Sequence, residues 1–283
     1  MPDSDDKTPI DAAAGSSGRN KDGLGQILMV SIALCLVCSI IVSTAAVSLK
    51  GQQQANKELD QKQNILRAAG LLPADSNVSA DGKSADELFE SFRVVAVDLN
   101  AGRKLPEFAV DGYDPIKAAK DPGQSRALSA DEDAATIRRL ENVSLVYLLD
   151  GPDGGLDKVV IPVRGYGLWG TLFGYLALEG DAQSIAGLGF YTHKETPGLG
   201  GEVDNSSWKA LWNGVALYDS EGQPAVSLVK SRSPESSDQA KYEVDALSGA
   251  TLTTRGVQNL VNFWTGDMAF GPYLQNIAAG NQG

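Results

Sequence analysis

The sequence predicts an α+β protein in which a single N-terminal transmembrane helix precedes a domain with an antiparallel sheet flanked by helices. Three observations predict this class: an uncharged apolar run over residues 27–49, a central region of short apolar segments separated by tight turns, and helix-forming segments on both sides of that region. Strands joined by tight turns run antiparallel, because a parallel connection needs a crossover of a dozen or more residues.

Composition narrows the possible functions. The chain has 24 Lys+Arg against 36 Asp+Glu, a net charge of -12, and phosphate recognition needs clustered positive charge, so we expect no nucleic-acid partner. It has one histidine, His193, and two cysteines, Cys35 and Cys38. These are too few for a His-rich metal site, a four-cysteine zinc site or a disulfide framework, and we assign no metal site.

The apolar run Ile27 to Leu49 is long enough to cross a hydrocarbon core of roughly 30 Å. We favour a retained anchor over a removed signal peptide, because the run is too long and the polar leader before it, residues 1–26, is long and acidic. The leader is expected to be disordered. Cys35 and Cys38 fall inside the run, which predicts helix-face packing rather than a redox motif. Lys and Arg residues are nearly balanced before and after the apolar run, so they leave the orientation of the helix in the membrane open.

The remaining elements follow in order. Residues 50–84 form a stalk and linker, in which the stretch 52–69 continues the membrane helix and ends near Gly70 and Pro73. The domain covers residues 85–283. It opens with a helix over 85–92 and a strand over 93–99. Ser129 to Glu132 reads as a capping box that begins a helix running through Leu140.

Hairpins and a terminal helix complete the domain. We expect strands at 143–149 and 158–163, strands at 171–178 and 185–191, a helix at 207–212, strands near 215–218 and 225–230, and a helix at about 253–268.

Three segments are candidates for a site. Residues 165–170 fit G-x-G-x-x-G, but a strand follows where a dinucleotide-binding fold needs a helix. We therefore favour a glycine-rich loop that holds Tyr166 and Trp169 near a site. The alternative is a plain hairpin corner. Residues 193–202 form a glycine-rich loop that either approaches a ligand or lies on the surface. Residues 245–257 place hydroxyls and a glycine at a helix start, which indicates an anion site or a Ser/Thr-rich cap.

One of these segments carries a resemblance to a known family. The segment Asp245 to Thr253 resembles the D-[GA]-x-S-G-A-[ST]-x-T signature of the FMN-binding domain family, in which the flavin is attached through its phosphate to the final threonine. The chain is also similar to the C-type subunits of the bacterial Na⁺-translocating NADH:quinone reductases. The similarity rests on the membrane helix and on three sequence segments, GYGLWGTLFGYLAL, ETPGLGGE and VQNLVNFWTGDMAFGPYL. The related G-type subunits of the Rnf complexes share the signature but match these three segments less well.

The resemblance implies roles for individual residues. Thr253 carries covalent FMN, and the signature's spacing favours it over its neighbour Thr254. The other implied cofactor-binding residues are Asp245, Ser248, Gly249, Ala250, Thr251 and Leu252 in the phosphate-facing turn, Glu195, Thr196, Gly198, Leu199 and Gly200 in the pocket loop, Tyr166, Leu168 and Trp169 against the ring, and Lys230 as a positive charge.

The resemblance also implies a function. The chain would relay electrons within a six-subunit complex that couples NADH oxidation to ubiquinone reduction and Na⁺ export, without oxidising NADH itself. A separate Mg²⁺-dependent flavin transferase would attach the FMN part of FAD. The protein would be anchored in the inner membrane, with residues 1–26 in the cytoplasm and the FMN domain in the periplasm. The alternative from a different class is an anchored anion-binding or sensory domain without redox chemistry.

Overall fold

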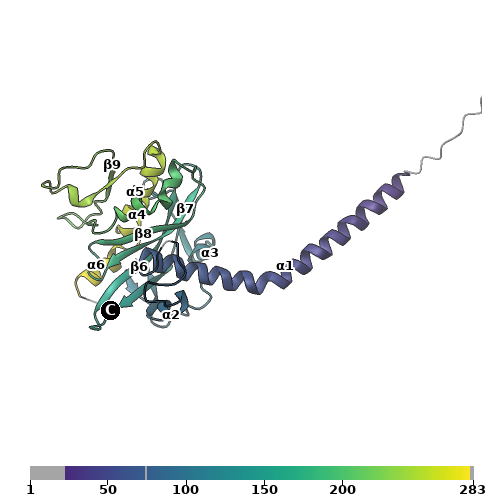
Figure 1. The fold of residues 1–283 in the computed structure, drawn as a ribbon, viewed down its shortest axis with the longest axis horizontal. Coiled ribbons are helices and arrows are strands. Elements are labelled where there is room, and N and C mark those ends of the chain that lie inside the picture. The colour runs from purple at the N-terminus through teal and green to yellow at the C-terminus, as the bar shows by residue number, and fades with distance from the viewer. Residues whose placement is uncertain (1–22, 74, 281–283) are drawn as a thin grey trace, which may run out of the picture. The chain divides into compact units, whose positions relative to one another are not determined.

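A computed structural model describes residues 23–73 and 75–280 of the chain (Figure 1). The leader predicted to be disordered falls mostly on residues 1–22, which lie outside the described residues, while residues 24–26 already belong to the first helix. The chain divides into two compact units, of which the first ends at Ala55 and the second begins at Asn56. The second unit is an α+β domain, as the sequence predicts.

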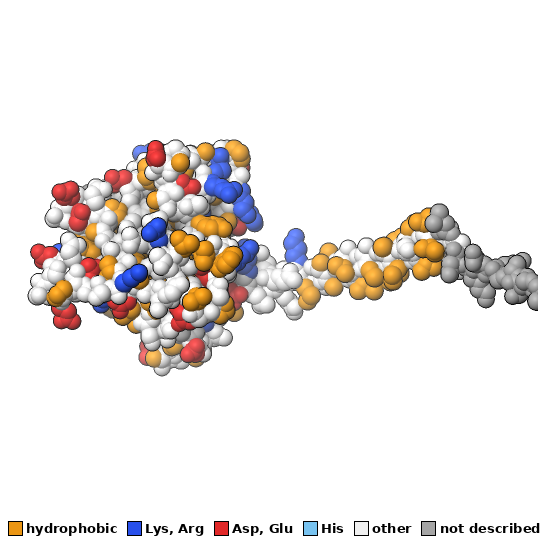
Figure 2. Space-filling view, turned by 90° about the horizontal axis from the view of Figure 1, so that it is seen from above, with side chains coloured by type: hydrophobic (Ala, Val, Ile, Leu, Met, Phe, Trp, Pro, Cys, Tyr) orange, Lys and Arg blue, Asp and Glu red, His pale blue; other side chains and the backbone are white. Residues whose placement is uncertain are grey.

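The first helix, α1 (Leu24–Ala68), contains both the apolar run and the polar stalk that the sequence predicts. Its most apolar window has a mean hydropathy of 2.6, so by length and composition it is long and apolar enough to cross a membrane. Hydrophobic side chains cover this helix over the apolar run (Figure 2). Cys35 and Cys38 lie within it, away from any strand-to-helix turn, as predicted.

The domain is built on a six-stranded antiparallel sheet with the order β2-β1-β5-β6-β7-β8. The two hairpins predicted within residues 143–191 form four adjacent strands of it, from β5 to the edge strand β8. The strands are β1 (Phe92–Asp98), β2 (Arg103–Lys104), β5 (Val143–Asp150), β6 (Leu156–Tyr166), β7 (Thr171–Glu179) and β8 (Ile185–Thr192).

Both faces of this sheet are covered, which explains why its central strands read as almost continuous apolar runs. In β5, Val146 and Leu148 belong to a core shared with α5 (Thr251–Thr265) and α6 (Gly271–Ala278). Leu145 and Tyr147 point to the opposite face and belong to a second core. That second core is shared with the C-terminal end of α1 and with α2 (Ala85–Phe89). The C-terminal helices, yellow in Figure 1, therefore pack on one side only.

Glycines in β8 let the end of α1 approach the sheet. A Cβ added at Gly187 would lie 2.3 Å from the carbonyl oxygen of Ala68, so only glycine fits there. Ile65 and Leu66 of the same helix end are fully buried. The stalk predicted from its helix-forming composition is thus partly a core element of the domain.

Smaller elements surround the sheet. They are α3 (Pro115–Lys120), β3 (Ser125–Ala127), β4 (Arg139–Glu141), η1 (Gly200–Asp204), α4 (Ser206–Ala210), β9 (Ser227–Val229), η2 (Ala240–Tyr242) and β10 (Glu243–Asp245). The strands β9 and β10 pair in parallel, a ladder that the sequence does not predict.

The helix predicted from Ser129 through Leu140 is wrong. The Glu132 side chain does reach back to Ser129, whose backbone N–H and hydroxyl both donate to Glu132 Oε2. The Asp133 carboxylate then accepts the backbone N–H groups of Ile137 and Arg138, and Arg138 takes a φ of 66°. A side chain that binds nearby backbone groups competes with helical hydrogen bonds, so the chain turns into β4 instead.

Two C-terminal predictions also need correction. Residues 215–218 make only isolated bridges, Ser184 with Ala216 and Tyr218 with Pro224, and form no strand. The helix predicted to continue to residue 268 ends at Thr265, with Gly266 as its extended C-cap. A separate helix, α6, follows with proline in its first turn, and it was not among the predicted elements.

Candidate functional site

Three loops that are far apart in sequence meet at the N-terminus of α5. Thr253 Oγ1 donates a hydrogen bond of 2.5 Å to Glu195 Oε2, across 58 residues of sequence. The other carboxylate oxygen, Glu195 Oε1, accepts the backbone N–H groups of Leu168 and Trp169 at 3.0 Å each. Both Thr253 and Glu195 are buried. One carboxylate therefore joins the 165–170 loop, the 193–202 loop and the 245–254 turn.

Glycines make this close approach possible. A Cβ added at Gly200 would lie 2.5 Å from Thr253 Oγ1 and 2.6 Å from Glu195 Oε2. A Cβ at Gly167 would lie 2.6 Å from Glu195 Oε1. The glycine-rich segment 165–170 thus serves the site by letting its backbone reach a carboxylate, and β7 follows it where a dinucleotide fold would have a helix.

The helix α5 is held against the same loop. A Cβ added at Gly256 would lie 2.4 Å from the carbonyl oxygen of Tyr166, so the first turns of α5 contact the loop backbone directly. Gly249 takes a φ of 72°, and a Cβ there would lie 3.0 Å from Leu199 Cδ2. The 245–254 turn and the 193–202 loop are therefore in contact at two places, Leu199 with Gly249 and Glu195 with Thr253.

The two adjacent threonines have different surroundings. Thr254 Oγ1 accepts the backbone N–H of Leu247 at 3.1 Å and so braces the turn that precedes the helix. Thr253 Oγ1 donates to a carboxylate and bonds no backbone group among the described residues. Of the two hydroxyls, only that of Thr253 bonds a residue of the 193–202 loop.

The N-terminus of α5 lacks a side-chain cap. Ala250 is the N-cap residue and offers no side-chain hydrogen bond, and the first turn contains no acidic residue. The first backbone N–H groups of a helix have no partner within the helix, and the positive end of the helix dipole favours an anion there. The sequence allows two interpretations of this segment, an anion site or a Ser/Thr-rich helix cap. The cap is not observed, because no side chain caps α5.

Large apolar side chains are exposed on the three loops. Tyr166, Leu168, Trp169, Leu199 and Leu252 each keep between 40 and 61% of their surface accessible. Exposed apolar side chains gathered on neighbouring loops mark a binding surface more often than chance exposure. The site thus combines a buried polar centre with an apolar rim.

His193 is a site residue to which the sequence alone assigns no role. Its Nδ1 accepts the backbone N–H of Glu195 at 3.2 Å, and its Nε2 lies 2.8 Å from Asp204 Oδ2. Because Nδ1 is an acceptor, the ring proton is on Nε2 and points to Asp204. In the sequence, the one indication of this role is that His193 stands two residues before Glu195.

Other predicted residues lie farther from the centre. Thr196 and Gly198 are exposed in the loop, where the Thr196 carbonyl accepts the N–H groups of Leu199 and Gly201. Asp245 is exposed, and its carbonyl accepts Trp208 Nε1. Ser248 and Thr251 are exposed on the turn.

Lys230 lies beside this turn without reaching Thr253. It directly follows β9, and the N–H of Ala246 donates to the carbonyl of Val229. Between Lys230 and Thr253 the structure gives neither a hydrogen bond nor an ion pair.

A buried ion pair supports the site from behind. Arg164, at the end of β6, binds Glu141 through both terminal nitrogens and lies over the ring of Trp264 of α5, 5.0 Å from its centroid. Trp264 Nε1 donates to the Arg164 carbonyl. These contacts fix the strand that leads into Tyr166 against the helix that carries Thr253.

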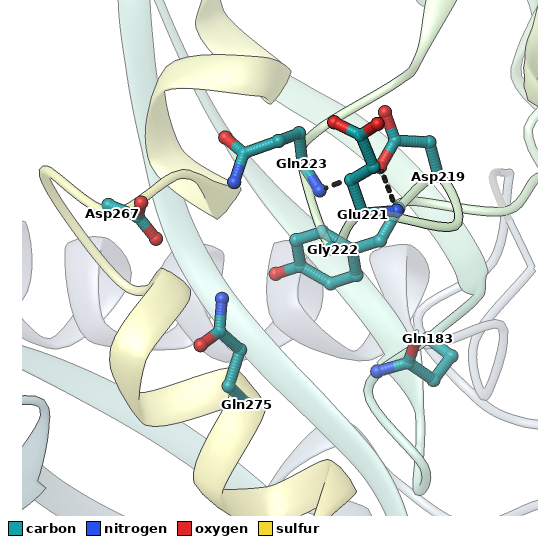
Figure 3. Close-up of a pocket in the computed structure, with 8 residues that line it drawn as sticks. Gln183, Asp219, Glu221, Gly222, Gln223, Asp267 and Gln275 are labelled. Carbon is teal, nitrogen blue, oxygen red and sulfur yellow. Dashed lines mark hydrogen bonds between the residues drawn. The ribbon is translucent and has the colours of Figure 1, made fainter.

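A polar pocket of about 370 Å³ lies elsewhere, lined by Gln183, Tyr218, Asp219, Glu221, Gly222, Gln223, Asp267 and Gln275 (Figure 3). Asp219 accepts the backbone N–H groups of Glu221 and Gln223, so its carboxylate closes a turn. None of the predicted site residues lines this pocket. Over residues 23–73 and 75–280, no group of three or more His, Cys, Asp or Glu side chains is arranged to hold a metal ion.

Comparisons with known proteins give a consistent result. Residues 167–266 match the FMN-binding domain family. The C subunit of the Na⁺-translocating NADH-quinone reductase of Pseudomonas aeruginosa is 48% identical over 92% of this chain and 98% of that protein. The corresponding subunit of Vibrio campbellii is 45% identical with the same coverage. The crystal structure of Shewanella oneidensis NqrC superimposes with a TM-score of 0.69 at 33% identity, over 79% of this chain and 99% of that one.

Proposed function

Because this chain belongs to the NqrC family, the C subunits of the Na⁺-translocating NADH-quinone reductases, we propose that it is a membrane-anchored electron carrier with FMN joined to Thr253 as a phosphoester. Its FMN-binding domain covers residues 167–266, which include most of the three loops of the site. The observation that carries the proposal is the Thr253 hydroxyl at the uncapped N-terminus of α5.

The residues present fit the phosphate end of FMN. The first-turn N–H groups of α5 and the glycine backbone at Gly249 supply donors for an anion, and the dipole of the helix favours its charge. The hydroxyl of Thr253 supplies the ester oxygen. Ser248 and Thr251, both exposed on the same turn, add hydroxyl donors within the signature.

The apolar rim fits the ring end of FMN. Tyr166, Leu168, Trp169, Leu199 and Leu252 offer exposed aromatic and aliphatic surface to a flat, largely apolar ring system. When bound, the flavin supplies the electron-transfer chemistry, and the protein supplies its position and surroundings. A carrier needs no proton-abstracting triad, which agrees with a chain that has one histidine.

The finer assignments concern the surroundings of this carrier. Residues 27–49 would span the inner membrane, residues 1–26 would lie in the cytoplasm, residues 50–84 would form the stalk and linker, and the FMN domain, residues 85–283, would lie in the periplasm. Neighbouring subunits of the six-subunit complex would exchange electrons with the flavin between NADH oxidation and quinone reduction coupled to Na⁺ export. A flavin transferase using FAD would attach the group, and the covalent link would keep the flavin from being lost to the medium.

Mass measurement on the full chain tests the proposal. The protein is co-expressed with the flavin transferase, and wild type, Thr253→Ala and Thr254→Ala are compared by intact and peptide mass under denaturing conditions. We expect an added FMN mass on the peptide spanning Thr251 to Arg255 in wild type and in Thr254→Ala, and its loss in Thr253→Ala. An unmodified wild type in a host that flavinylates a control protein would reject the proposal in favour of an anchored anion-binding domain.

A further inference from the structure

We propose that Glu195 is a catalytic residue for the modification of its own chain: its carboxylate accepts the proton of Thr253 Oγ1 as that oxygen attacks the phosphorus of a flavin donor. This inference rests on the proposed function, because it concerns how the phosphoester at Thr253 is made. It gives Glu195 a chemical task in the attachment of the flavin, in addition to a place in the cofactor pocket.

The geometry is that of a nucleophile and its base. Thr253 Oγ1 donates directly to Glu195 Oε2 at 2.5 Å, so the proton to be removed already points at the carboxylate. An activated hydroxyl nucleophile is recognised by a base within hydrogen-bond reach that is itself oriented by a third group. Here the third group is the 165–170 loop, whose Leu168 and Trp169 N–H groups hold the opposite carboxylate oxygen.

Other groups near the hydroxyl are engaged elsewhere. Glu195 is the only side chain that bonds Thr253 Oγ1 among the described residues. The two ring nitrogens of His193 bond the Glu195 backbone N–H and the Asp204 carboxylate, so the imidazole does not address Thr253. Thr254 Oγ1 is bonded to the Leu247 N–H. Among the described residues, Glu195 is therefore the side chain placed to act as the general base for Thr253.

The step balances without any change of oxidation state. The O–H bond of Thr253 breaks, and its proton passes to Glu195 Oε2. The Thr253 oxygen forms a bond to the FMN phosphorus of a flavin phosphoanhydride, here FAD, and the anhydride bond to the adenylate breaks. The adenylate leaves with the bonding electron pair, and Glu195 then releases its proton to solvent.

Access requires the covering segment to move while the base stays in place. Gly200 lies directly over Thr253 Oγ1, and Thr253 is fully buried. Glu195, however, is anchored by hydrogen bonds that do not involve the segment Thr196 to Gly200: its Oε1 accepts the Leu168 and Trp169 N–H groups, and its backbone N–H donates to His193 Nδ1. Displacement of that segment uncovers the hydroxyl and leaves it hydrogen-bonded to Glu195.

The test is the initial rate of FMN incorporation into the full chain in detergent, with purified transferase, FAD and Mg²⁺, followed by intact mass. Glu195→Gln keeps the size of the side chain and an amide oxygen for the Leu168 and Trp169 N–H groups. Loss of a general base lowers a rate by about 10²–10⁴-fold, and we expect a loss of that order. Glu179→Gln removes the same charge from a carboxylate that bonds Lys158 at the end of β7, outside the three loops, and serves as the matched control with an unchanged rate.

The pH dependence separates a base from a structural role. In Glu195→Gln, solvent must remove the proton, so the rate should rise with pH, and the ratio of the wild-type to the variant rate should fall as pH rises. His193, Asp204 and Lys194 are present in both proteins, as is the transferase, so the ratio compares the two side chains at position 195 on the same background. Glu195→Asp should recover part of the wild-type rate.

Each outcome decides the inference. A Glu195→Gln protein modified at the wild-type rate would overturn it, as would a slower rate whose ratio to wild type is the same at every pH. Circular dichroism and the unfolding midpoint establish that the variant is folded. Failure of the wild type to be modified would reject the proposed function itself, which keeps the two failures distinguishable.

Discussion

At the scale of single residues, the site depends on glycines that bring backbone against polar atoms. Gly167 and Gly200 each lie where an added methyl group would overlap a different oxygen of the Glu195 carboxylate, Oε1 and Oε2 respectively. This arrangement lets three loops share one buried acid without leaving its oxygens unpaired, since each oxygen accepts at least one hydrogen bond.

Gly200→Ala is expected to disturb this centre. Its Cβ would lie 2.5 Å from Thr253 Oγ1 and 2.6 Å from Glu195 Oε2, and both atoms are buried and bonded to each other. The loop must shift, at a cost of about 1–3 kcal/mol in the free energy of unfolding, and FMN incorporation should slow. Chemical unfolding and intact mass measure the two effects.

The control is Gly189→Ala, where the added methyl group would make an ordinary contact of 3.9 Å with Ala68 Cβ. It should change both quantities little. Equal stability and equal incorporation in Gly200→Ala and Gly189→Ala would contradict the close approach at Gly200.

At the scale of elements, the C-terminal end of α1 belongs to the hydrophobic core of the domain. Ile65 and Leu66 are fully buried in the core on the face of the sheet opposite α5. We expect Leu66→Ala to lower the free energy of unfolding by about 2–5 kcal/mol, through lost burial and the cavity left behind. Chemical unfolding of the full chain in detergent, followed by tryptophan fluorescence, measures the change.

Leu59→Ala provides the comparison within the same helix, because Leu59 keeps 36% of its surface exposed. Its cost should be well below that of Leu66→Ala. If the two substitutions cost the same, the end of α1 is not packed in the domain core.

The sequence predicts the elements whose signals are local. The apolar run, the two central hairpins and the start of α5 near Thr253 follow from hydrophobic periodicity and turn residues. The helix predicted to follow the Ser129 capping box does not form, because Asp133 competes for the backbone N–H groups of Ile137 and Arg138. Local patterns cannot reveal such competition.

The candidate site shows the same limit. The signature at 245–253 locates the threonine and its helix start, and the resemblance names Glu195 as a pocket residue. The hydrogen bond between Thr253 and Glu195 spans 58 residues, and the role of His193 depends on Asp204 across the loop. Neither pairing leaves a periodic or compositional trace, because both arise only when the loops fold together.

At the scale of the whole molecule, buried tyrosines make the domain sensitive to alkali. Burial raises the pKa of Tyr147 from its ordinary value of 10.0 to about 12, and hydrogen bonds with Gln61 and Tyr175 oppose the shift only in part. The folded pKa lies above the unfolded one, so this stability is fully present below pH 10.0 and is lost as pH rises through about 12.

Tyr147→Phe is therefore expected to flatten the fall of the unfolding free energy between pH 10.0 and about 12. The fall should not vanish, because burial also raises the pKa of Tyr113, Tyr191 and Tyr273 to about 12. Unfolding titrations at several pH values, with phenolate absorbance recorded in parallel, give the slope. Parallel curves for the two proteins would show that folding does not raise the pKa of Tyr147.

The distance along the chain between the parts of the site has a consequence for biogenesis. The loops at 165–170 and 193–202 precede Thr253 in the chain, and α5, which carries Thr253, packs against β6. A nascent or truncated chain therefore contains the acid but no folded acceptor. Under the proposed function, attachment of the flavin marks a chain whose translation and folding are finished, so flavin content reports the completeness of each molecule that enters assembly.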